Sequence, residues 1–489
     1  MNVLTQAQGW LLIGVFFVAM FSVLVLLPKS KKTKKFFLVG NRNVPWLIMG
    51  LSMAATWVWA PSMFTAAEKA YTQGFAGLFW FVAPNVLTLW LFGYFATKMR
   101  ERKPNGWTFS YYIKENYSNR SHNLFVTESI VLQIASMAVQ LLAGAVIFSK
   151  ICGLPFFWTT VTLAAIPLIY AAIDGIKGTA ISDFVKMLFI ASVLLTGLPL
   201  MFNNAGTDTF IKGLGGISGD FGSLFSKKGL EVFLSFGIPS TIGLLSGTFG
   251  DQMFWQRAFS VRRFNVKKMM ILAGFVFAIV PICLGSFGFF AAGAGLDVAD
   301  KQLTNVAAVT AFLPKWFLYL FFIMILAGLI STVDSVLCAF SAVGGHDIIN
   351  RLQEKGIATN VKPLTFARIF MVVISAMGVC IANIPGLAIT TLWLLYGMFR
   401  ASVMMPTVFA TIGSKMHERG IFYGILSAWL IGWPTYMYAS LNGNTPLIVV
   451  SSLFVVLVPG ILAKFLKGGK APSPDMAIVS PDDEEENEN

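Results

Sequence analysis

The sequence is dominated by a succession of apolar stretches of about 20 residues, separated by short polar connections. A helix of that length crosses the roughly 30 Å hydrocarbon core of a bilayer, where backbone exposed to lipid must be helical or belong to a closed barrel. We place thirteen such stretches, near residues 8–28, 46–69, 75–97, 123–149, 155–174, 180–202, 233–256, 268–294, 308–344, 365–383, 388–413, 420–440 and 446–466. They predict an all-α membrane protein with about 13 transmembrane helices in one domain, residues 1–470.

The composition excludes several other classes of protein. Only 12% of the residues are charged, against about 25% in an ordinary soluble domain. The four cysteines stand singly, without the spacing of a zinc site or a disulfide framework. All three histidines (His122, His346 and His417) fall in short polar connections, which argues against a histidine proton relay. Because the sequence shows no Ser/His/Asp arrangement and no phosphate-binding glycine loop, we expect neither an enzyme nor an organic cofactor.

The distribution of basic residues predicts the orientation in the membrane. Residues 1–8 carry no Lys or Arg, whereas five lysines follow the first apolar stretch. The positive-inside rule places that loop in the cytoplasm, and on this basis 27 of the 36 Lys and Arg fall on the same side. We therefore expect a multi-pass plasma membrane protein with its N-terminus outside, no nucleic acid partner, and a disordered acidic cytoplasmic tail, residues 471–489.

Two of the apolar stretches look interrupted. The second contains Trp57-Val58-Trp59-Ala60-Pro61, and a proline inside a helix removes one amide donor. The seventh contains Phe236-Gly237-Ile238-Pro239, followed by several glycines up to Gly250. Each alone is explained by an ordinary kink, but their separation by five stretches is that of inverted repeats, about residues 45–202 and 233–413. In transporters with this plan, broken helices bind solute and ion near the middle of the membrane.

The ninth stretch carries hydroxyl groups and an acid in apolar surroundings. Ser331 and Thr332 could supply oxygen ligands to Na⁺, although isolated Ser and Thr in membrane helices usually bond back to a carbonyl. Asp334 is an acid that we do not expect to face lipid, and it could pair with a basic group. In the sixth stretch, Asp183 and Lys186 are spaced for an i,i+3 ion pair, with a position in the inner ion pathway as the alternative.

Three short motifs make the chain similar to the sodium:solute symporter family, over about residues 8–466. They are Phe37-Leu38-Val39-Gly40-Asn41-Arg42, Asp251-Gln252-x-x-Trp255-Gln256-Arg257 and Ser331-Thr332-x-Asp334-Ser335. The resemblance implies a LeuT-like core of five plus five helices. It departs from the family where the usual Gly-Gly pair before the sixth stretch is Asp174-Gly175-Ile176-Lys177-Gly178, which puts membership of a well-known subgroup in doubt.

The resemblance also implies roles for individual residues. Sodium would be bound by the carbonyls of Ala55, Val58 and Gly328 and by the hydroxyls of Ser331 and Thr332. Asp183 matches an acid used in ion release and Arg42 a basic residue involved in coupling, with Asp334 as a further candidate for the ion pathway.

For the solute, the chain looks most similar to the urea and polyamine permease branch, on the segments 57–60, 77–81 and 251–256. The residues expected to line the pocket are Trp57, Trp59, Gln133, Thr248 and Trp393. Such a pocket suits a small, flat, neutral amide, which stacks on indole rings, although these tryptophans could equally pack between helices.

The sequence thus predicts a sodium-coupled symporter that imports a small polar solute, urea or a related amide or amine. Proline, a monocarboxylate or a sugar on the same fold, and a transporter-like membrane sensor, remain as alternatives. The coupling ion is expected to be Na⁺ rather than H⁺, because a cage of hydroxyls and carbonyls has no group that titrates near neutral pH.

Overall fold

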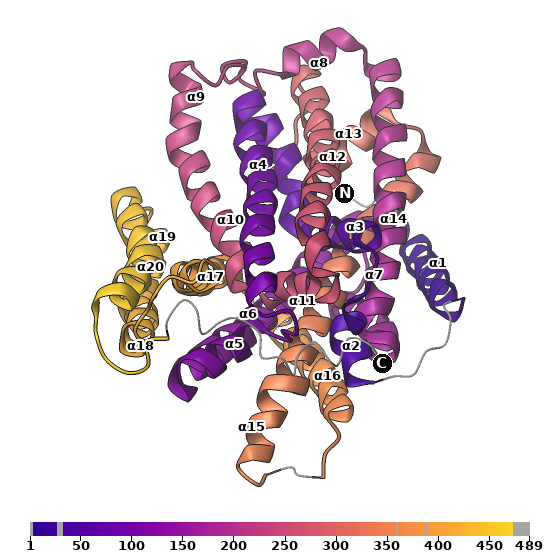
Figure 1. The fold of residues 1–489 in the computed structure, drawn as a ribbon. Helices are drawn as coiled ribbons and strands as arrows, with labels where there is room; N and C mark the ends of the chain where they lie inside the picture. The colour runs from indigo at the N-terminus through magenta and orange to yellow at the C-terminus, as the bar shows by residue number, and fades with distance from the viewer. Residues whose placement is uncertain (1–2, 27–32, 358–359, 388, 473–489) are drawn as a thin grey trace.

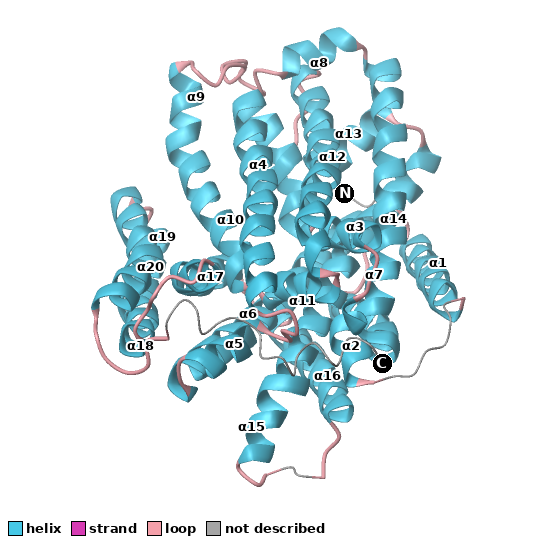
Figure 2. Ribbon diagram, viewed as in Figure 1, coloured by secondary structure: helices cyan, strands magenta, loops and turns pink. Residues whose placement is uncertain are grey.

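The computed structural model describes residues 3–26, 33–357, 360–387 and 389–472. Within these ranges the chain forms helices and no strand, which confirms the all-α prediction (Figure 2). Three parts of the sequence predictions fall outside the described residues: Lys29, Lys31 and Lys32 of the first loop, most of the acidic tail (473–489), and the side chain of Trp393.

The helices follow one another with short connections. The first part of the chain contains α1 (Gln6–Val25), α2 (Lys34–Val39), η1 (Gly40–Arg42), α3 (Trp46–Trp57), α4 (Ala60–Arg102), α5 (Phe109–Asn116), α6 (Asn119–Cys152) and α7 (Phe156–Ala205). The middle contains α8 (Thr207–Gly213), α9 (Lys227–Val232), η2 (Phe233–Gly237), α10 (Ile238–Gly250), α11 (Gln252–Ser260), η3 (Arg263–Asn265), α12 (Val266–Gly293), η4 (Lys301–Leu303), α13 (Thr304–Phe312) and α14 (Lys315–Ala342). The last part contains η5 (Val343–Ile348), α15 (Ile349–Glu354), α16 (Pro363–Ala382), α17 (Ile389–Thr411), α18 (Glu418–Ser427), η6 (Ala428–Gly432), α19 (Trp433–Leu441) and α20 (Thr445–Phe465).

Nine helical segments of the described chain are long and apolar enough to cross a membrane. Two of the helices, α4 with 43 residues and α7 with 50, are long enough for two crossings each. Each contains one glycine in the same non-helical conformation: Gly74 (φ 54°, ψ −150°) and Gly175 (φ 58°, ψ −145°). These glycines lie where the sequence predicts that the second and third, and the fifth and sixth, apolar stretches separate.

Gly74 reverses the direction of the chain. A Cβ atom on Gly77 would stand 2.7 Å from the carbonyl oxygen of Lys69, eight residues earlier. In a straight helix two residues eight apart are separated by about 12 Å along the axis, so the contact requires a tight turn between them. A positive φ is open to glycine at little cost, which explains the residue at both joints.

The most buried of these segments are those that contain α6 and α14. In each, 78% of the most apolar 18 residues lie inside the protein. The corresponding share is 28% for α1 and α16, which therefore lie at the rim of the bundle. In Figure 1, α8 stands at one end of the bundle and α15 at the opposite end. The connections around residues 203–232 and 344–365, predicted on opposite sides of the membrane, thus lie at opposite ends of the molecule.

Two helices are discontinuous near the centre of the molecule. The chain leaves the helical conformation at Val58 (φ −81°, ψ 68°) and Trp59 (φ −88°, ψ 168°), between α3 and α4. It leaves it again at Asp251 (φ −102°, ψ 120°), between α10 and α11. The first break is where the sequence predicts one, and Pro61 is in the first turn of α4, where no amide partner is lost.

The second break lies at the end of the glycine-rich stretch predicted to be interrupted, directly after Gly250, and not at Phe236-Gly237-Ile238-Pro239. That segment forms the π-helical turn η2 and the start of α10, with Pro239 in its first turn. The interruption lies twelve residues further on, where Asp251 accepts a hydrogen bond from the Met253 amide and caps α11.

Candidate functional site

The break between α3 and α4 is held open by side chains from other helices. Gln140 of α6 accepts a hydrogen bond from the Ala60 amide at 3.0 Å, which satisfies the first donor of α4. Asn305 donates to the Met63 carbonyl at 2.8 Å, one turn further on. On the α3 side, the Val58 amide donates to the carbonyls of Ala54 and Ala55 at 3.0 and 3.1 Å. The unwound segment is therefore fixed on both sides.

Helix α14 packs directly against this break. A Cβ atom on Gly328 would stand 3.3 Å from Cγ1 of Val58 and 2.5 Å from Sδ of Met63, so a side chain here would have to displace Met63. Thr332, one turn later, donates to the Thr56 carbonyl at 3.3 Å. Val58 of the break, Ala55 of the last turn of α3, and Gly328 and Thr332 of α14 thus come from segments that meet here.

Ser331 is a polar residue of this region whose side chain has no hydrogen-bond partner in the described part of the chain. It is fully buried, and its Oγ has no hydrogen-bond partner among the residues that the structure describes. Buried hydroxyls are almost always bonded, so an exception needs an explanation. A cation bound by hydroxyls and carbonyls would provide one, because Ser331 stands between Gly328 and Thr332 on the helix that contacts the break.

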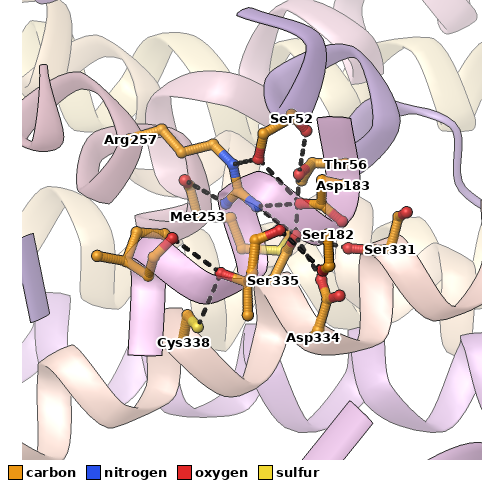
Figure 3. A network of polar contacts seen from close by, with 12 residues as sticks. Ser52, Thr56, Ser182, Asp183, Met253, Arg257, Ser331, Asp334, Ser335 and Cys338 are labelled. Atoms are coloured by element: carbon orange, nitrogen blue, oxygen red, sulfur yellow. Dashed lines mark hydrogen bonds and ion pairs between the residues drawn. The ribbon is translucent and has the colours of Figure 1, made fainter. Parts of the chain in front are cut away.

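A polar network lies beside Ser331 and joins α3, α7, α11 and α14 (Figure 3). Its centre is Ser335, whose Oγ donates to the Ser331 carbonyl at 2.6 Å and lies 2.9 Å from Thr56 Oγ1. Arg257 of α11 donates to Ser335 Oγ at 2.5 Å and, through Nε, to Ser52 Oγ at 3.2 Å. The backbone that carries Ser331 is therefore connected to a buried guanidinium.

Four fully buried charges form the far side of this network. Lys186 Nζ lies 2.9 Å from Asp183 Oδ1 and 2.6 Å from Asp334 Oδ2, and Arg257 lies 3.2 Å from Asp183 Oδ2. Tyr170 also donates to Asp334 at 2.5 Å. Two acids and two bases balance in charge, as buried ions must. The i,i+3 pair between Asp183 and Lys186 forms, and the basic partner of Asp334 is Lys186.

Arg42 is held by a different set of contacts. Together with Gly40 and Asn41 it has a left-handed backbone, with φ of 57°, which is uncommon for a long side chain. Its guanidinium donates to the carbonyls of Asn105 and Gly106 at 2.6 and 3.3 Å and stacks over the Trp107 ring at 4.9 Å. Arg42 therefore tethers η1 to the connection that precedes α5.

A small cavity of about 10 Å³ lies beside the first break, with room for about one water molecule. It is lined by Thr56, Trp57, Trp59, Ser136, Gln140, Met253, Phe254, Thr332, Tyr396 and Arg400. Of the residues predicted to line the solute pocket, Trp57 and Trp59 do so. A larger hollow of about 370 Å³ lies between residues 3–8 and Lys315, but it is open and shares no residue with the broken helices.

Gln133 and Thr248 are buried but are not among the residues that line the cavity. Gln133 instead donates to Asp251 Oδ1 at 2.8 Å, and Tyr396 donates to Asp251 Oδ2 at 3.0 Å. Arg400 lies over the Tyr396 ring at 3.6 Å. Tyr396 and Arg400 were missed in the sequence, although a charged residue within an apolar stretch is itself a signal of function.

A second polar cluster, near α5 and η5, was also missed. His122 Nε2 lies 3.1 Å from Asp347 Oδ1, which also accepts hydrogen bonds from Thr108 and Ser110 at 3.0 Å. Burial lowers the pKa of the nearby Lys34, although the charge of Asp347 opposes this shift. The placement of the histidines in polar connections is wrong for two of them: His122 is buried in the first turn of α6 and His346 in η5.

The chain is similar to several transporters of known name. It is 23% identical to the urea-proton symporter DUR3 of Oryza sativa, over 94% of this chain and 70% of that protein. It is 22% identical to the urea active transporter of Saccharomyces cerevisiae, over 71% of this chain and 51% of that protein. It is 23% identical to the sodium/pantothenate symporter of Haemophilus influenzae, over 90% and 92%.

Solved structures show the same fold. A Na⁺-coupled sialic acid symporter in an outward-open state superposes with a TM-score of 0.78 at 18% identity, over 95% of this chain and 99% of that one. The transporter MhsT with L-phenylalanine superposes with a TM-score of 0.50 at 15% identity, over 86% and 99%. The discontinuous helices and these superpositions establish the LeuT-like core of inverted repeats.

The family relationship rests on the sequence as well as on the fold. The sequence model of the sodium:solute symporter family matches residues 36–428, which include both broken helices, the charged network and α14. The family and the relatives of this chain are transporters and not enzymes. The chain is a member of the sodium:solute symporter family.

Proposed function

We propose that this protein is a sodium-coupled symporter that imports urea or a related small amide across the plasma membrane by alternating access. The observation that carries the sodium site is the buried hydroxyl of Ser331, which has no partner within the described ranges and lies on the helix that packs against the unwound segment. The proposed ligands are the carbonyls of Ala55, Val58 and Gly328 and the hydroxyls of Ser331 and Thr332. Oxygen atoms alone suit a hard cation such as Na⁺.

The residues around the cavity suit a small solute with a carbonyl group, and the cavity, which has room for about one water molecule, must widen to admit urea. Trp57 Nε1 is buried and has no acceptor within the described part of the chain. Thr56, Ser136 and Gln140 add hydroxyl and amide groups to the same cavity. Urea offers one carbonyl acceptor and two amino donors on a flat body that fits against indole rings. The rice and yeast relatives are named as urea transporters, which supports the same solute.

The contacts suggest how ion and solute binding are coupled. Thr56 and Thr332 line the cavity and also form the hydrogen bond between α3 and α14. A cation bound between Ala55, Val58 and Ser331 would hold these two helices together and thereby fix two walls of the solute cavity. Solute would then bind better to the sodium-loaded protein, and the two ligands would raise each other's affinity by the same factor. Rocking of one helical bundle against the other would expose the site alternately to each side.

Uptake by the purified protein in proteoliposomes tests this proposal. An inward Na⁺ gradient is expected to accelerate uptake of labelled urea, and replacement of Na⁺ by K⁺ should remove the acceleration. The double variant Ser331→Ala/Thr332→Ala should lose it as well. Ser192→Ala removes an exposed hydroxyl of α7 that bonds to the Leu188 carbonyl and serves as the control. Uptake that is equally fast without Na⁺, or in the double variant, contradicts the sodium site.

Competition identifies the solute. Unlabelled urea should reduce the uptake of labelled urea, whereas proline, a monocarboxylate and a sugar should leave it unchanged. If one of these competes while urea does not, the solute assignment is wrong although the fold and the ion site stand.

A further inference from the structure

Glu128 of α6 is a buried acid for which the transport mechanism above has no use. Glu128 is 1% exposed, and its Oε1 has no hydrogen-bond partner among the described residues. The same oxygen lies 3.0 Å from the point where a Cβ would stand on Gly250, the last residue of α10. Glu128 therefore packs directly against the second broken helix.

The charges around Glu128 do not balance. The charged side chains that act on it are Asp251 of the break and Arg400 of α17, with the Tyr396 ring beneath the Arg400 guanidinium. Two carboxyl groups thus share one cation. The network of Asp183, Lys186, Asp334 and Arg257 differs in this respect, because there two acids face two bases.

The contacts show which of the two acids keeps its negative charge. Asp251 accepts hydrogen bonds from Gln133, Tyr396 and the Met253 amide, at 2.8, 3.0 and 3.0 Å. Three donors stabilise the carboxylate of Asp251, whereas the Arg400 guanidinium favours the charged form of both acids alike. Glu128 makes no ion pair in the described part of the chain. A buried, unpaired carboxylate costs several kcal/mol, so such a group takes up a proton instead.

We propose that Glu128 is a proton-binding site of the transporter, loaded while the break between α10 and α11 is closed over it. When the break or α17 moves and water reaches the carboxyl group, the O–H bond breaks, the electron pair stays on the carboxylate, and the proton passes to water. The release step rests on the proposed transport cycle, whereas the bound proton does not depend on the identity of the solute or on Na⁺. Arg400 lines the solute cavity and packs against α10 at Gly247 and at Gly250, where Glu128 also packs, so movement at the cavity reaches Glu128.

Infrared spectroscopy of the purified protein in lipid tests the bound proton directly. At neutral pH the wild-type protein should show the C=O stretch of a protonated carboxyl group that Glu128→Gln lacks. Glu101→Gln is the matched control, because Glu101 is 54% exposed in its side chain and paired with Lys98, so its removal should leave that band unchanged. Equal bands in wild type and Glu128→Gln overturn the proposal, since Glu128 would then be ionised and a cation other than H⁺ would have to balance it.

The stability of Glu128→Gln is informative by itself. Gln has the shape and the hydrogen-bonding groups of a protonated Glu, so the variant should fold and keep its thermal midpoint. If Glu128 is ionised and compensates Arg400, the same variant loses a buried charge pair and should unfold, which counts against the proposal.

Proton movement in the wild-type protein separates this proposal from the proposed function. In proteoliposomes with a pH-sensitive dye inside, solute uptake should be accompanied by a pH change that Glu128→Gln loses. A pH change in the wild type without any dependence on Na⁺ supports the proton site and contradicts the sodium site. Sodium-driven uptake with no pH change in either protein contradicts release of the proton from Glu128.

Discussion

Buried polar side chains in this protein are satisfied in different ways, and the differences indicate their roles. Lys186 has two carboxylate partners, at 2.9 and 2.6 Å, whereas Ser331 has no partner among the described residues. A fully paired group stabilises the fold, while an unpaired one is available to a ligand. We therefore expect substitutions of Lys186 to act on stability and substitutions of Ser331 to act on transport.

Lys186→Met should destabilise the protein by about 3–5 kcal/mol, because Asp334 loses its cation inside the protein. The double variant Lys186→Met/Asp334→Asn removes both charges and should recover part of that loss. Thermal unfolding in detergent measures both effects. Lys228→Met is the control, since Lys228 pairs with Glu231 on the surface, where such pairs contribute about 0–1 kcal/mol. Equal effects of the two lysine substitutions contradict the role of the buried network.

Trp57→Phe tests the solute site. In the wild type, the ring centroids of Trp57 and Phe254 are 5.0 Å apart. Phenylalanine at position 57 keeps this aromatic packing but removes the indole N–H donor. If Nε1 donates to the solute carbonyl, the KM for urea should rise about tenfold, the equivalent of one hydrogen bond of roughly 1.4 kcal/mol, with little change in stability. Trp158→Phe, at a residue that is 60% exposed, is the control. An unchanged KM would mean that Trp57 packs against its neighbours and does not donate a hydrogen bond to the solute.

For single residues, the sequence predicts which polar residues matter better than it predicts which other residues they contact. Asp183, Asp334 and Ser331 could be singled out because polar groups in apolar helices are rare. Arg257 and Tyr170, which complete the network, could not be assigned, because their contacts span 74 and 164 positions of the chain and depend on the fold. Arg400 could have been singled out in the same way, because it too is a charged residue within an apolar stretch.

At the scale of elements, local chemistry determines where helices stop. The first break was predictable because Pro61 marks the new helix start in the sequence itself. The second lies at the end of the predicted glycine-rich stretch, and its position at Asp251 was not predictable, because Asp251 accepts hydrogen bonds from Gln133 and Tyr396, which no short sequence pattern contains. Gly175, part of the segment where the chain departs from the family's Gly-Gly pair, still supplies the joint at that point.

Gly175→Ala should therefore disturb the joint inside α7. Its φ of 58° disfavours any side chain by about 1–2 kcal/mol, and a Cβ there would stand 2.3 Å from the Phe37 carbonyl. Gly206→Ala has the same kind of backbone, with φ of 81°, but open space around it. We expect Gly206→Ala to lower the free energy of unfolding by about 1–2 kcal/mol and Gly175→Ala to lower it further, as measured by thermal unfolding. Equal losses would show that the contact with α2 does not constrain the joint.

For the whole molecule, the alternation of apolar stretches was sufficient to predict an all-α membrane fold with repeats. The number of thirteen spans, predicted from the apolar stretches, and the direction of insertion, predicted from the basic loops, remain predictions. The two ends of the bundle, near α8 and α15, provide sites at which the direction is measurable (Figure 1).

Thiol labelling from outside intact cells should distinguish the two ends. In a background with Cys380→Ser, which removes the exposed cysteine, Lys228→Cys should react with a membrane-impermeant maleimide and Lys355→Cys should not. Permeabilised cells should label both positions, because both side chains are exposed. The reverse pattern would place the N-terminus in the cytoplasm.

The central claim is that Na⁺ binds where α14 meets the break between α3 and α4, and equilibrium binding of radioactive sodium to the purified protein tests it most directly. The wild-type protein should bind sodium saturably, and unlabelled Na⁺ but not K⁺ should displace it. Ser331→Ala/Thr332→Ala should weaken binding by at least about tenfold, or 1.4 kcal/mol, while Ser192→Ala should bind as the wild type does. Binding by the double variant with wild-type affinity would contradict the account.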